Sequence, residues 1–283
     1  MVFLNGCPLR CRWCNNPESQ HSRPDLALNL NKCIGTRECG LCLKVCSMGA
    51  ITPAEDGKIR IKRQSCDMCF ACTADCPSEA LHAFGALRSV DEIMEAVEAD
   101  SVFFERSGGG MTLSGGEPLL QGEFAIALLR GAKQRKIDTA IETCGHVDWQ
   151  VLREAAGHCN TVFFDIKCID AAKHMEFTGV DNALIVSNLR GLVAEFPQLP
   201  IVVRTPLIPG FNHSVADITQ VIEFLTPLPG VKYEVLPYHR LGTPKYDYLG
   251  REYLLGDVVL NPETEKTVKE LVNQYAASRR GVQ

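Results

Sequence analysis

The chain has 283 residues, of which 46% are hydrophobic and 22% are charged, and this composition is typical of a folded globular protein of one large or two ordinary domains. A formal net charge of −5 gives no electrostatic reason to expect nucleic acid binding. No apolar run approaches the ~20 residues of a membrane-spanning helix, and the segment before Cys7 is too short for a signal peptide. We therefore expect a cytoplasmic protein that binds neither nucleic acid nor membrane.

Cysteine is the informative residue, because eleven of the fourteen cysteines lie in the first 76 positions. A large chain with ample core residues and no secretion signal does not need a disulfide scaffold, whereas cysteines at short fixed spacings indicate metal ligands. The other three cysteines have no partner at metal spacing and are predicted to be small buried hydrophobic residues; they are Cys144, Cys159 and Cys168. The eleven form three groups: Cys7, Cys11 and Cys14; Cys33, Cys39, Cys42 and Cys46; and Cys66, Cys69, Cys72 and Cys76.

The third group matches the run of bacterial ferredoxins, in which three thiolates hold one [4Fe–4S] cluster, the fourth ligates a neighbouring cluster, and a proline follows, here Pro77. The second group has the same ending, but its first cysteine is set back, which we interpret as a short insertion at residues 35–37, and Ser47 replaces the proline. Zinc is the alternative, although structural zinc sites normally stop at two separated pairs of ligands. The predicted clusters are held by Cys33, Cys39, Cys42 and Cys76, and by Cys46, Cys66, Cys69 and Cys72.

The first group has only three thiols, Cys7, Cys11 and Cys14, and the nearest further candidate ligand, His21, follows Pro17. Structural metal sites are closed by a fourth ligand, whereas an open coordination position is typical of reactive sites. A [4Fe–4S] cluster on these three residues would leave one iron free to bind a substrate.

From Ser89 onward, strand-like and helical stretches alternate, which predicts an α/β fold with a parallel sheet. Ser89 and Glu92 have the spacing of a capping box at the start of a helix. Together with a short strand at 2–5, about six strand–helix units predict a partial (β/α)6 TIM-like barrel formed by residues 1–23 and 84–283, with a ferredoxin-like insert at 24–83. The other expected strands are 111–113, 137–143, 161–167, 201–207 and 231–237, and the expected helices are 119–134, 149–156, 182–195, 215–225 and 262–276.

Charged side chains occur where these strands end. Alternation places Asp165 and Lys167 on one face of their strand, and Glu142, Arg204 and His239 fall at or just past other strand ends. In α/β barrels this end carries the active site, and buried charges are costly unless they are paired or bind a ligand. Two alternatives stay open: Asp165 and Lys167 as an internal ion pair, and His239 as an ordinary surface or core histidine.

The first cysteine group, with Trp13 as the aromatic residue before Cys14, resembles the signature of the radical S-adenosylmethionine (radical SAM) superfamily. The stretch 6–18 resembles the glycyl-radical-enzyme activating enzymes, and the insert resembles that of their subgroup with two auxiliary [4Fe–4S] clusters. Later segments support the same branch; they are Ser107-Gly-Gly-Gly-Met-Thr-Leu-Ser-Gly-Gly-Glu117-Pro118, Glu142-Thr-Cys-Gly145, Asp165-Ile-Lys167, Arg204-Thr-Pro-Leu-Ile-Pro-Gly210-Phe-Asn212 and Pro237-Tyr-His239-Arg-Leu-Gly242.

The resemblance implies where S-adenosylmethionine binds. Gly115, Gly116 and Glu117 would hold its amino group, although Gly-Gly-Glu-Pro by itself is only a turn before a helix. Lys167 would pair with its carboxylate, and Trp13 would lie against the adenine or simply pack in the core. Glu142, Asp165 and His239 would contact the ligand or a neighbouring monovalent cation. Arg204 would hold either the ligand or the backbone of the partner protein.

The resemblance also implies the chemistry. The enzyme would be an oxidoreductase that cleaves S-adenosylmethionine reductively to a 5′-deoxyadenosyl radical, which takes a hydrogen atom from a glycine of a partner glycyl radical enzyme. None of its side chains would need to act as acid or base. The two auxiliary clusters would pass electrons inward from a flavodoxin or ferredoxin, or help to dock the partner. Two other functions remain open: a radical SAM enzyme with a different substrate, and an electron-transfer iron–sulfur protein.

The start of the chain departs from the family pattern. Relatives carry roughly 20–30 further residues before the first cysteine, which include an Asp-Gly-Pro-Gly element and most of the first strand, and loops of this kind need a scaffold. Here Met1 stands six residues before Cys7. We therefore expect a shortened first strand.

Overall fold

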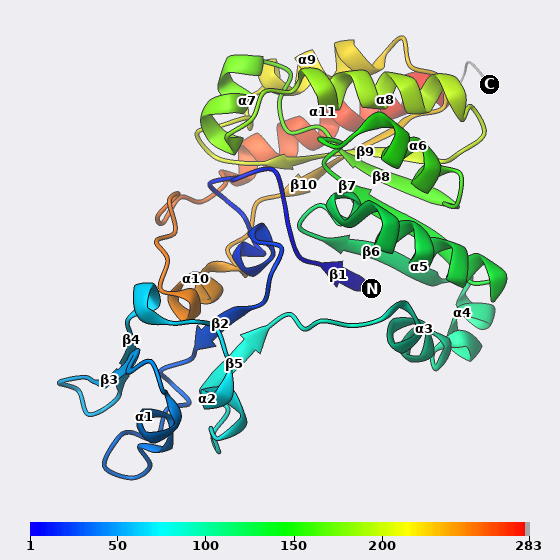
Figure 1. Cartoon of the computed structure of the whole chain (residues 1–283). Coiled ribbons are helices and arrows are strands. Elements are labelled where there is room, and N and C mark those ends of the chain that lie inside the picture. The colour runs from blue at the N-terminus through cyan, green and yellow to red at the C-terminus, as the bar shows by residue number, and fades with distance from the viewer. Residues whose placement is uncertain (281–283) are drawn as a thin grey trace.

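The computed structural model describes residues 1–280, and its centre is one sheet of six parallel strands in the order β1-β6-β7-β8-β9-β10 (Figure 1). This is the α/β arrangement with a parallel sheet that the sequence predicts, and it is consistent with a partial TIM barrel. The first strand pairs with β6 from Val2 to Leu4. The strands are β1 Val2–Leu4, β6 Gly110–Gly115, β7 Asp138–Thr143, β8 Thr161–Asp165, β9 Ile201–Leu207 and β10 Lys232–Pro237.

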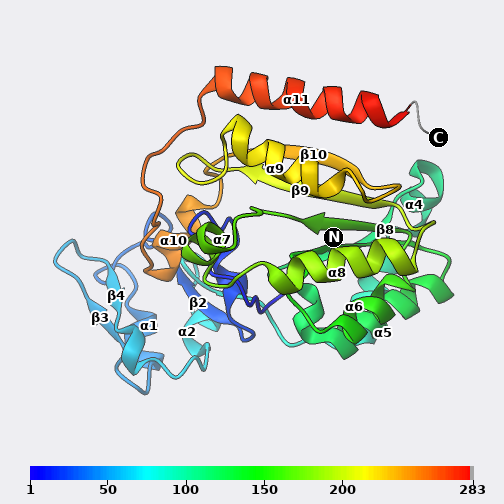
Figure 2. The ribbon, with the colours of Figure 1, turned by 90° about the horizontal axis from the view of Figure 1, so that it is seen from above.

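Helices that follow the strands bury one face of the sheet (Figures 1 and 2). On β8, Val162 and Phe164 are fully buried in this core, whereas Phe163 and Asp165 point to the other face, which the alternation of residue types predicts. Ser214 starts α9 with a capping box formed with Asp217. The covering helices are α3 Val90–Glu98, α5 Gly122–Gln134, α6 Trp149–Ala156, α8 Ala183–Glu195, α9 Val215–Leu225 and α11 Pro262–Arg280.

Residues 25–84 form a separate lobe that projects from the sheet at the lower left of Figure 1. Its first strand, β2 (Asp25–Leu28), pairs antiparallel with its last, β5 (Leu81–Phe84), and β3 (Ile51–Pro53) pairs with β4 (Ile59–Ile61). The lobe therefore begins and ends at the same place, as an insert must.

The lobe repeats one short unit twice. The helices α1 (Leu41–Val45) and α2 (Ala71–Ala74) lie thirty positions apart, as do the cysteines around them. Both helices follow a residue in the left-handed conformation, Gly40 with φ 68° and Phe70 with φ 58°. This conformation is costly for a phenylalanine, so the surrounding structure must impose it.

In the described part of the barrel, three short helices were not predicted: α4 (Ser101–Ser107), α7 (Ala171–Thr178) and α10 (Thr243–Leu249). α10 packs against β2 and against the 3-10 helix η1 (Pro17–Gln20), which follows the first cysteine group. α10 therefore connects the end of the barrel with the segment of the first cysteine group and with the inserted lobe. None of the helices within residues 1–280 is long and apolar enough to span a membrane.

Candidate functional site

A cavity of about 330 Å³ opens at the carboxyl ends of the parallel strands. It brings together residues that are far apart in the sequence, from the first cysteine group and from the ends of β6, β7, β8, β9 and β10. All three cysteines of that group line it, with eight of the nine predicted ligand-binding residues: Cys7, Cys11, Cys14, Trp13, Gly115, Gly116, Glu142, Asp165, Lys167, Arg204 and His239.

The segment that carries the three cysteines is anchored by backbone hydrogen bonds. The Arg10 N–H donates to the Thr178 carbonyl at 2.7 Å, at the end of α7, and the Tyr246 hydroxyl of α10 donates to the Cys14 carbonyl at 2.9 Å. These two helices therefore fix both sides of a segment that has little regular structure of its own.

Trp13 both packs in the interior and lines the cavity. Its side chain is 6% exposed and stacks on Phe211 at 4.8 Å between ring centroids, and Phe211 in turn stacks on Phe177 at 4.7 Å. Such aromatic pairs contribute about 0.5–1.5 kcal/mol beyond their buried area. The two interpretations of Trp13 from the sequence are thus compatible.

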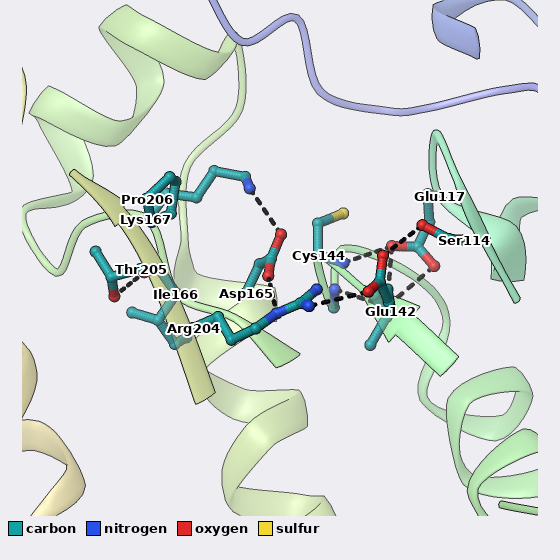
Figure 3. Close-up of polar contacts among 12 residues, drawn as sticks. Ser114, Glu117, Glu142, Cys144, Asp165, Ile166, Lys167, Arg204, Thr205 and Pro206 are labelled. Atoms are coloured by element: carbon teal, nitrogen blue, oxygen red, sulfur yellow. Dashed lines mark hydrogen bonds and ion pairs between the residues drawn. The ribbon is translucent and has the colours of Figure 1, made fainter. Parts of the chain in front are cut away.

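Polar side chains form a continuous network across four neighbouring strands (Figure 3). Ser114 donates to Glu142 at 2.5 Å, and Arg204 donates to the other Glu142 oxygen at 2.9 Å. Arg204 also lies 3.5 Å from Asp165, which accepts a hydrogen bond from Lys167 at 3.0 Å. Two carboxylates and two cationic side chains therefore balance one another. The Asp165–Lys167 ion pair, which the sequence left open as an alternative, is present and lies in the cavity wall.

Lys167 remains a cation in this setting. Burial has the largest single effect and would lower its pKa, but the Asp165 carboxylate and the thiols of Cys11 and Cys144 together raise it by more, and the pKa of Lys167 ends well above its ordinary value. Asn212 fixes the backbone beneath it by donating to the Lys167 carbonyl at 2.6 Å. The cavity thus holds a permanent ammonium group that can pair with a carboxylate.

Glu117 is the one predicted ligand-binding residue that does not line this cavity. Its carboxylate is fully buried and accepts hydrogen bonds from the Thr143 hydroxyl at 2.9 Å and from the Cys144 and Leu119 N–H groups at 2.7 and 3.1 Å. Burial raises the pKa of Glu117. A side chain whose oxygens are occupied in this way ties the turn after β6 to the end of β7.

The two glycines before Glu117 do reach the cavity, and close packing explains why they are glycines. A Cβ atom on Gly115 would lie 2.4 Å from the Leu4 carbonyl oxygen, and one on Gly116 would lie 2.3 Å from that of Gly6. Gly115 also has a φ of 116°. This part of the wall is therefore polypeptide backbone that a ligand can approach closely.

Cys144 lines the same cavity, a position that the sequence interpretation missed. It is buried as predicted, at 7% exposed, and so are Cys159 and Cys168. The available signal was its place directly after the strand-end pair Glu142–Thr143. Ser114, Thr143 and Asn212 were also missed, because small polar residues at strand ends are common.

In the inserted lobe, one small cavity is lined by Cys33, Cys39, Cys42 and Cys76. Burial raises the pKa of Cys72 to about 11, and the neighbouring thiols of Cys66, Cys46 and Cys69 add to this effect. Within residues 1–280, no three Cys, His, Asp or Glu side chains converge on a point suited to a single metal ion. A [4Fe–4S] cluster instead takes each thiolate on a different iron, and the structure offers two sets of four thiols.

Comparisons with known proteins identify the family to which the chain belongs. The model of the radical SAM superfamily matches residues 63–225. The structure of Streptococcus suis SuiB bound to precursor peptide SuiA superimposes with a TM-score of 0.56 over 99% of this chain and 46% of that chain, at 13% identity, which supports the fold alone.

Two curated relatives are similar over nearly the whole chain. The isethionate sulfite-lyase activating enzyme of Nitratidesulfovibrio vulgaris is 51% identical over 98% of this chain and 91% of its own length. The (2S)-3-sulfopropanediol sulfolyase activating enzyme of Bilophila wadsworthia is 46% identical over 97% of this chain and 91% of its own length.

The fold and the cavity therefore define a radical SAM protein. Within that superfamily, the chain belongs to the glycyl-radical-enzyme activating enzymes. It is an oxidoreductase that cleaves S-adenosylmethionine and generates a glycyl radical on a partner enzyme, as the resemblance implied. A function limited to electron transfer, and a radical SAM function on another substrate, are set aside.

Proposed function

We propose that the partner is a carbon–sulfur lyase of the isethionate sulfite-lyase kind. The observation that carries this is a gradient of similarity: three relatives named as isethionate sulfite-lyase activating enzymes are 49–52% identical over at least 92% of the chain. Identity is 39% to a choline trimethylamine-lyase activating enzyme and 36% to a 4-hydroxyphenylacetate decarboxylase activating enzyme. The relative at 46%, named for a (2S)-3-sulfopropanediol sulfolyase, makes that lyase the second candidate.

Activation assays on purified lyases test the partner. The chain, reduced anaerobically with S-adenosylmethionine, is incubated with isethionate sulfite-lyase, with (2S)-3-sulfopropanediol sulfolyase and with choline trimethylamine-lyase, and the glycyl radical is counted by electron paramagnetic resonance. We expect the highest yield with the first lyase. Equal or higher yield with either of the others would refute the assignment.

We also propose that the chain holds three [4Fe–4S] clusters, one on Cys7, Cys11 and Cys14 and one on each set of four cysteines in the insert. The donor sets support this, because the first has three thiols at an open cavity and the others have four each. When bound, the first cluster supplies the electron that cleaves S-adenosylmethionine.

The side chains of the cavity would bind and orient that ligand. Lys167 is placed to pair with its carboxylate, and the backbone of Gly115 and Gly116 to approach its amino group. Arg204 would hold the ligand or the partner's backbone, and Trp13 and His239 complete the wall. The tight walls would exclude water and direct the radical to one glycine.

A monovalent cation beside the ligand is a further part of the proposal. It would be bound by oxygens of Glu142 and Asp165, with His239 close by, and it would have to displace the Arg204 guanidinium from those carboxylates.

The same preparation tests the cavity without a partner. With dithionite as reductant, we expect 5′-deoxyadenosine from the unaltered chain and none from Cys11→Ala. Product formation by the variant would refute the proposed cluster site. For the insert, we propose that its clusters relay electrons from a flavodoxin or ferredoxin, with docking of the lyase as the second candidate role.

A further inference from the structure

Apolar side chains are exposed on the protein surface next to the cavity, on the side of β10. Leu236, near the end of β10, lines the cavity and is still 37% exposed. The turn before α10 and the chain between α10 and α11 expose further apolar side chains. We call the set the apolar rim; its members are Leu236, Leu241, Leu254, Val258 and Val259.

A pair of tyrosines holds Leu254 beside the cavity. Tyr238, which also lines the cavity, and Tyr253 are hydrogen-bonded through their hydroxyls at 2.6 Å. On the other side of Leu254, Leu255 packs against the buried cluster that contains Trp13. The chain is therefore fixed against the cavity wall at this point, and yet the side chain of Leu254 is 62% exposed.

An ion pair joins the other members of the rim. Arg240 and Asp257 lie 2.7 Å apart, which brings Leu241 close to Val258 and Val259. Leu241 is 81% exposed and Val259 is 77% exposed. The chain between α10 and α11 runs past the carboxyl ends of the strands, where the cavity opens (Figures 1 and 2).

The pattern of residues in this segment differs from that of an ordinary surface loop. Five of the seven residues at 254–260 are apolar, but only Leu255 and Leu260 pack into the interior. A segment that only covered the core would carry polar residues at its outward positions. Single exposed apolar residues are common, whereas a group of them beside a functional cavity indicates an interaction surface.

We propose that the partner glycyl radical enzyme docks on the apolar rim when its glycine enters the cavity. The glycine must reach the radical inside the cavity, so the partner has to cover the cavity opening and exclude water from it. The core of a protein interface is depleted in charged residues, and the rim is an apolar surface that continues directly from the cavity through Leu236. The inference rests on the proposed binding of S-adenosylmethionine in this cavity, but not on which lyase is the partner.

Activation kinetics of the complete, cluster-loaded enzyme test this inference. The partner used is the lyase with the highest radical yield in the activation assay, and the rate of glycyl radical formation is measured at a series of lyase concentrations. For Leu241→Ser/Leu254→Ser we expect a rise of about tenfold or more in the KM for the lyase. Because both side chains are mostly exposed, the unfolding temperature should change little. Formation of 5′-deoxyadenosine with dithionite and without lyase should also stay unchanged.

Two matched variants separate docking from a general effect of exposed apolar residues. Val102→Ser/Phe103→Ser removes side chains that are 54% and 69% exposed on α4. Because α4 ends just before β6 begins, it lies at the opposite end of the sheet from the cavity (Figure 1), and we expect a wild-type KM. Leu241→Met/Leu254→Met keeps apolar side chains of similar size and should retain a KM close to that of the wild type.

Each other outcome overturns the inference in its own way. A wild-type KM in Leu241→Ser/Leu254→Ser would do so, as would an equal rise in the α4 variant. If formation of 5′-deoxyadenosine without lyase falls as much as activation does, these residues serve the cavity itself. If the KM is unchanged but the oligomeric state changes, as measured by light scattering, a second copy of the chain covers the rim. Failure of the proposed ligand site differs from all of these, because the wild type would then form no 5′-deoxyadenosine.

Discussion

Individual residues of this site serve it in two ways: some line the cavity, and others hold those residues in place. Glu117 belongs to the second kind, because its buried carboxylate joins the turn after β6 to the end of β7 through Thr143, Cys144 and Leu119. Asn212 does the same for the backbone at Lys167.

Replacement of Glu117 by alanine should therefore destabilise the enzyme. It leaves three buried donors without an acceptor, each at a cost of about 1–3 kcal/mol. We expect a loss of about 3 kcal/mol or more, seen as a fall of about 6 °C or more in the anaerobic thermal unfolding temperature. Glu123→Ala, at an exposed position of α5, is the control and should change little. Equal unfolding temperatures for both variants would contradict the role given to Glu117.

A second prediction at this scale concerns His174, which is 1% exposed and donates from Nδ1 to the Val180 carbonyl at 2.7 Å. Burial lowers its pKa, helped by nearby Lys167 and His146 and opposed by Asp181 and the hydrogen bond to Val180. In the unfolded chain this histidine takes up a proton near pH 6.5, whereas in the folded chain it stays neutral down to a lower pH. The free energy of unfolding therefore decreases as the pH falls below about 6.5. Between pH 7.5 and 5.5, the unfolding temperature of the wild type should fall more steeply than that of His174→Gln. Parallel curves would show that His174 does not contribute.

At the scale of elements, α10 is a seven-residue helix that joins the first cysteine group to the inserted lobe. It packs on η1 and β2, and Asp25 of β2 lies between Arg251, at 2.5 Å, and Arg63 of the insert, at 3.6 Å. The helix begins against the first cysteine group, where a Cβ atom on Gly242 would lie 2.6 Å from the Asn15 Cα.

Gly242→Ala should for this reason displace α10 or the neighbouring cysteine segment, since either one must move to admit the methyl group. We expect iron loss of up to about four atoms per chain and weaker binding of S-adenosylmethionine, measured by iron assay and calorimetry. Gly157→Ala is a suitable control, because Gly157 has an ordinary φ of −61° and its added Cβ would meet nothing closer than 3.4 Å. Wild-type iron content and affinity in Gly242→Ala would contradict the close fit.

At the scale of the whole molecule, the barrel and the inserted lobe have separate sets of thiols but share the contacts of α10. We propose that the barrel performs the radical chemistry and that the lobe supplies electrons to it.

The iron content and the rate of product formation with two different reductants test this proposal. The wild type should contain about twelve irons, and Cys11→Ala and Cys72→Ala should each lose about four. Cys72→Ala should still form 5′-deoxyadenosine with dithionite, which can reduce the barrel cluster directly, but should form it several-fold more slowly with reduced flavodoxin. Equal slowing with both reductants would contradict a relay role for the lobe.

Most strands and helices of the barrel can be predicted from patterns of residues that are close together in the sequence. Strands β6 to β10 and their main helices were predicted because apolar periodicity, capping residues such as Ser89 and alternation around Asp165 operate over a few neighbouring positions. The spacing of the cysteines likewise predicts which of them act together as ligands, because most thiolates of one cluster come from a single short segment.

The sequence by itself thus determined the order of parallel strands and helices, the place of the insert and most residues of the cavity wall. Only the tertiary structure decided that Glu117 turns inward, that Cys144 lines the cavity, and that α10 joins the lobe to the barrel. The physical reason is that α10 contacts residues more than two hundred positions away in the sequence, and that the positions of Glu117 and Cys144 depend on competition for a few hydrogen-bond acceptors in a buried site. No local pattern encodes such competition, because its outcome depends on which groups the complete fold removes from water.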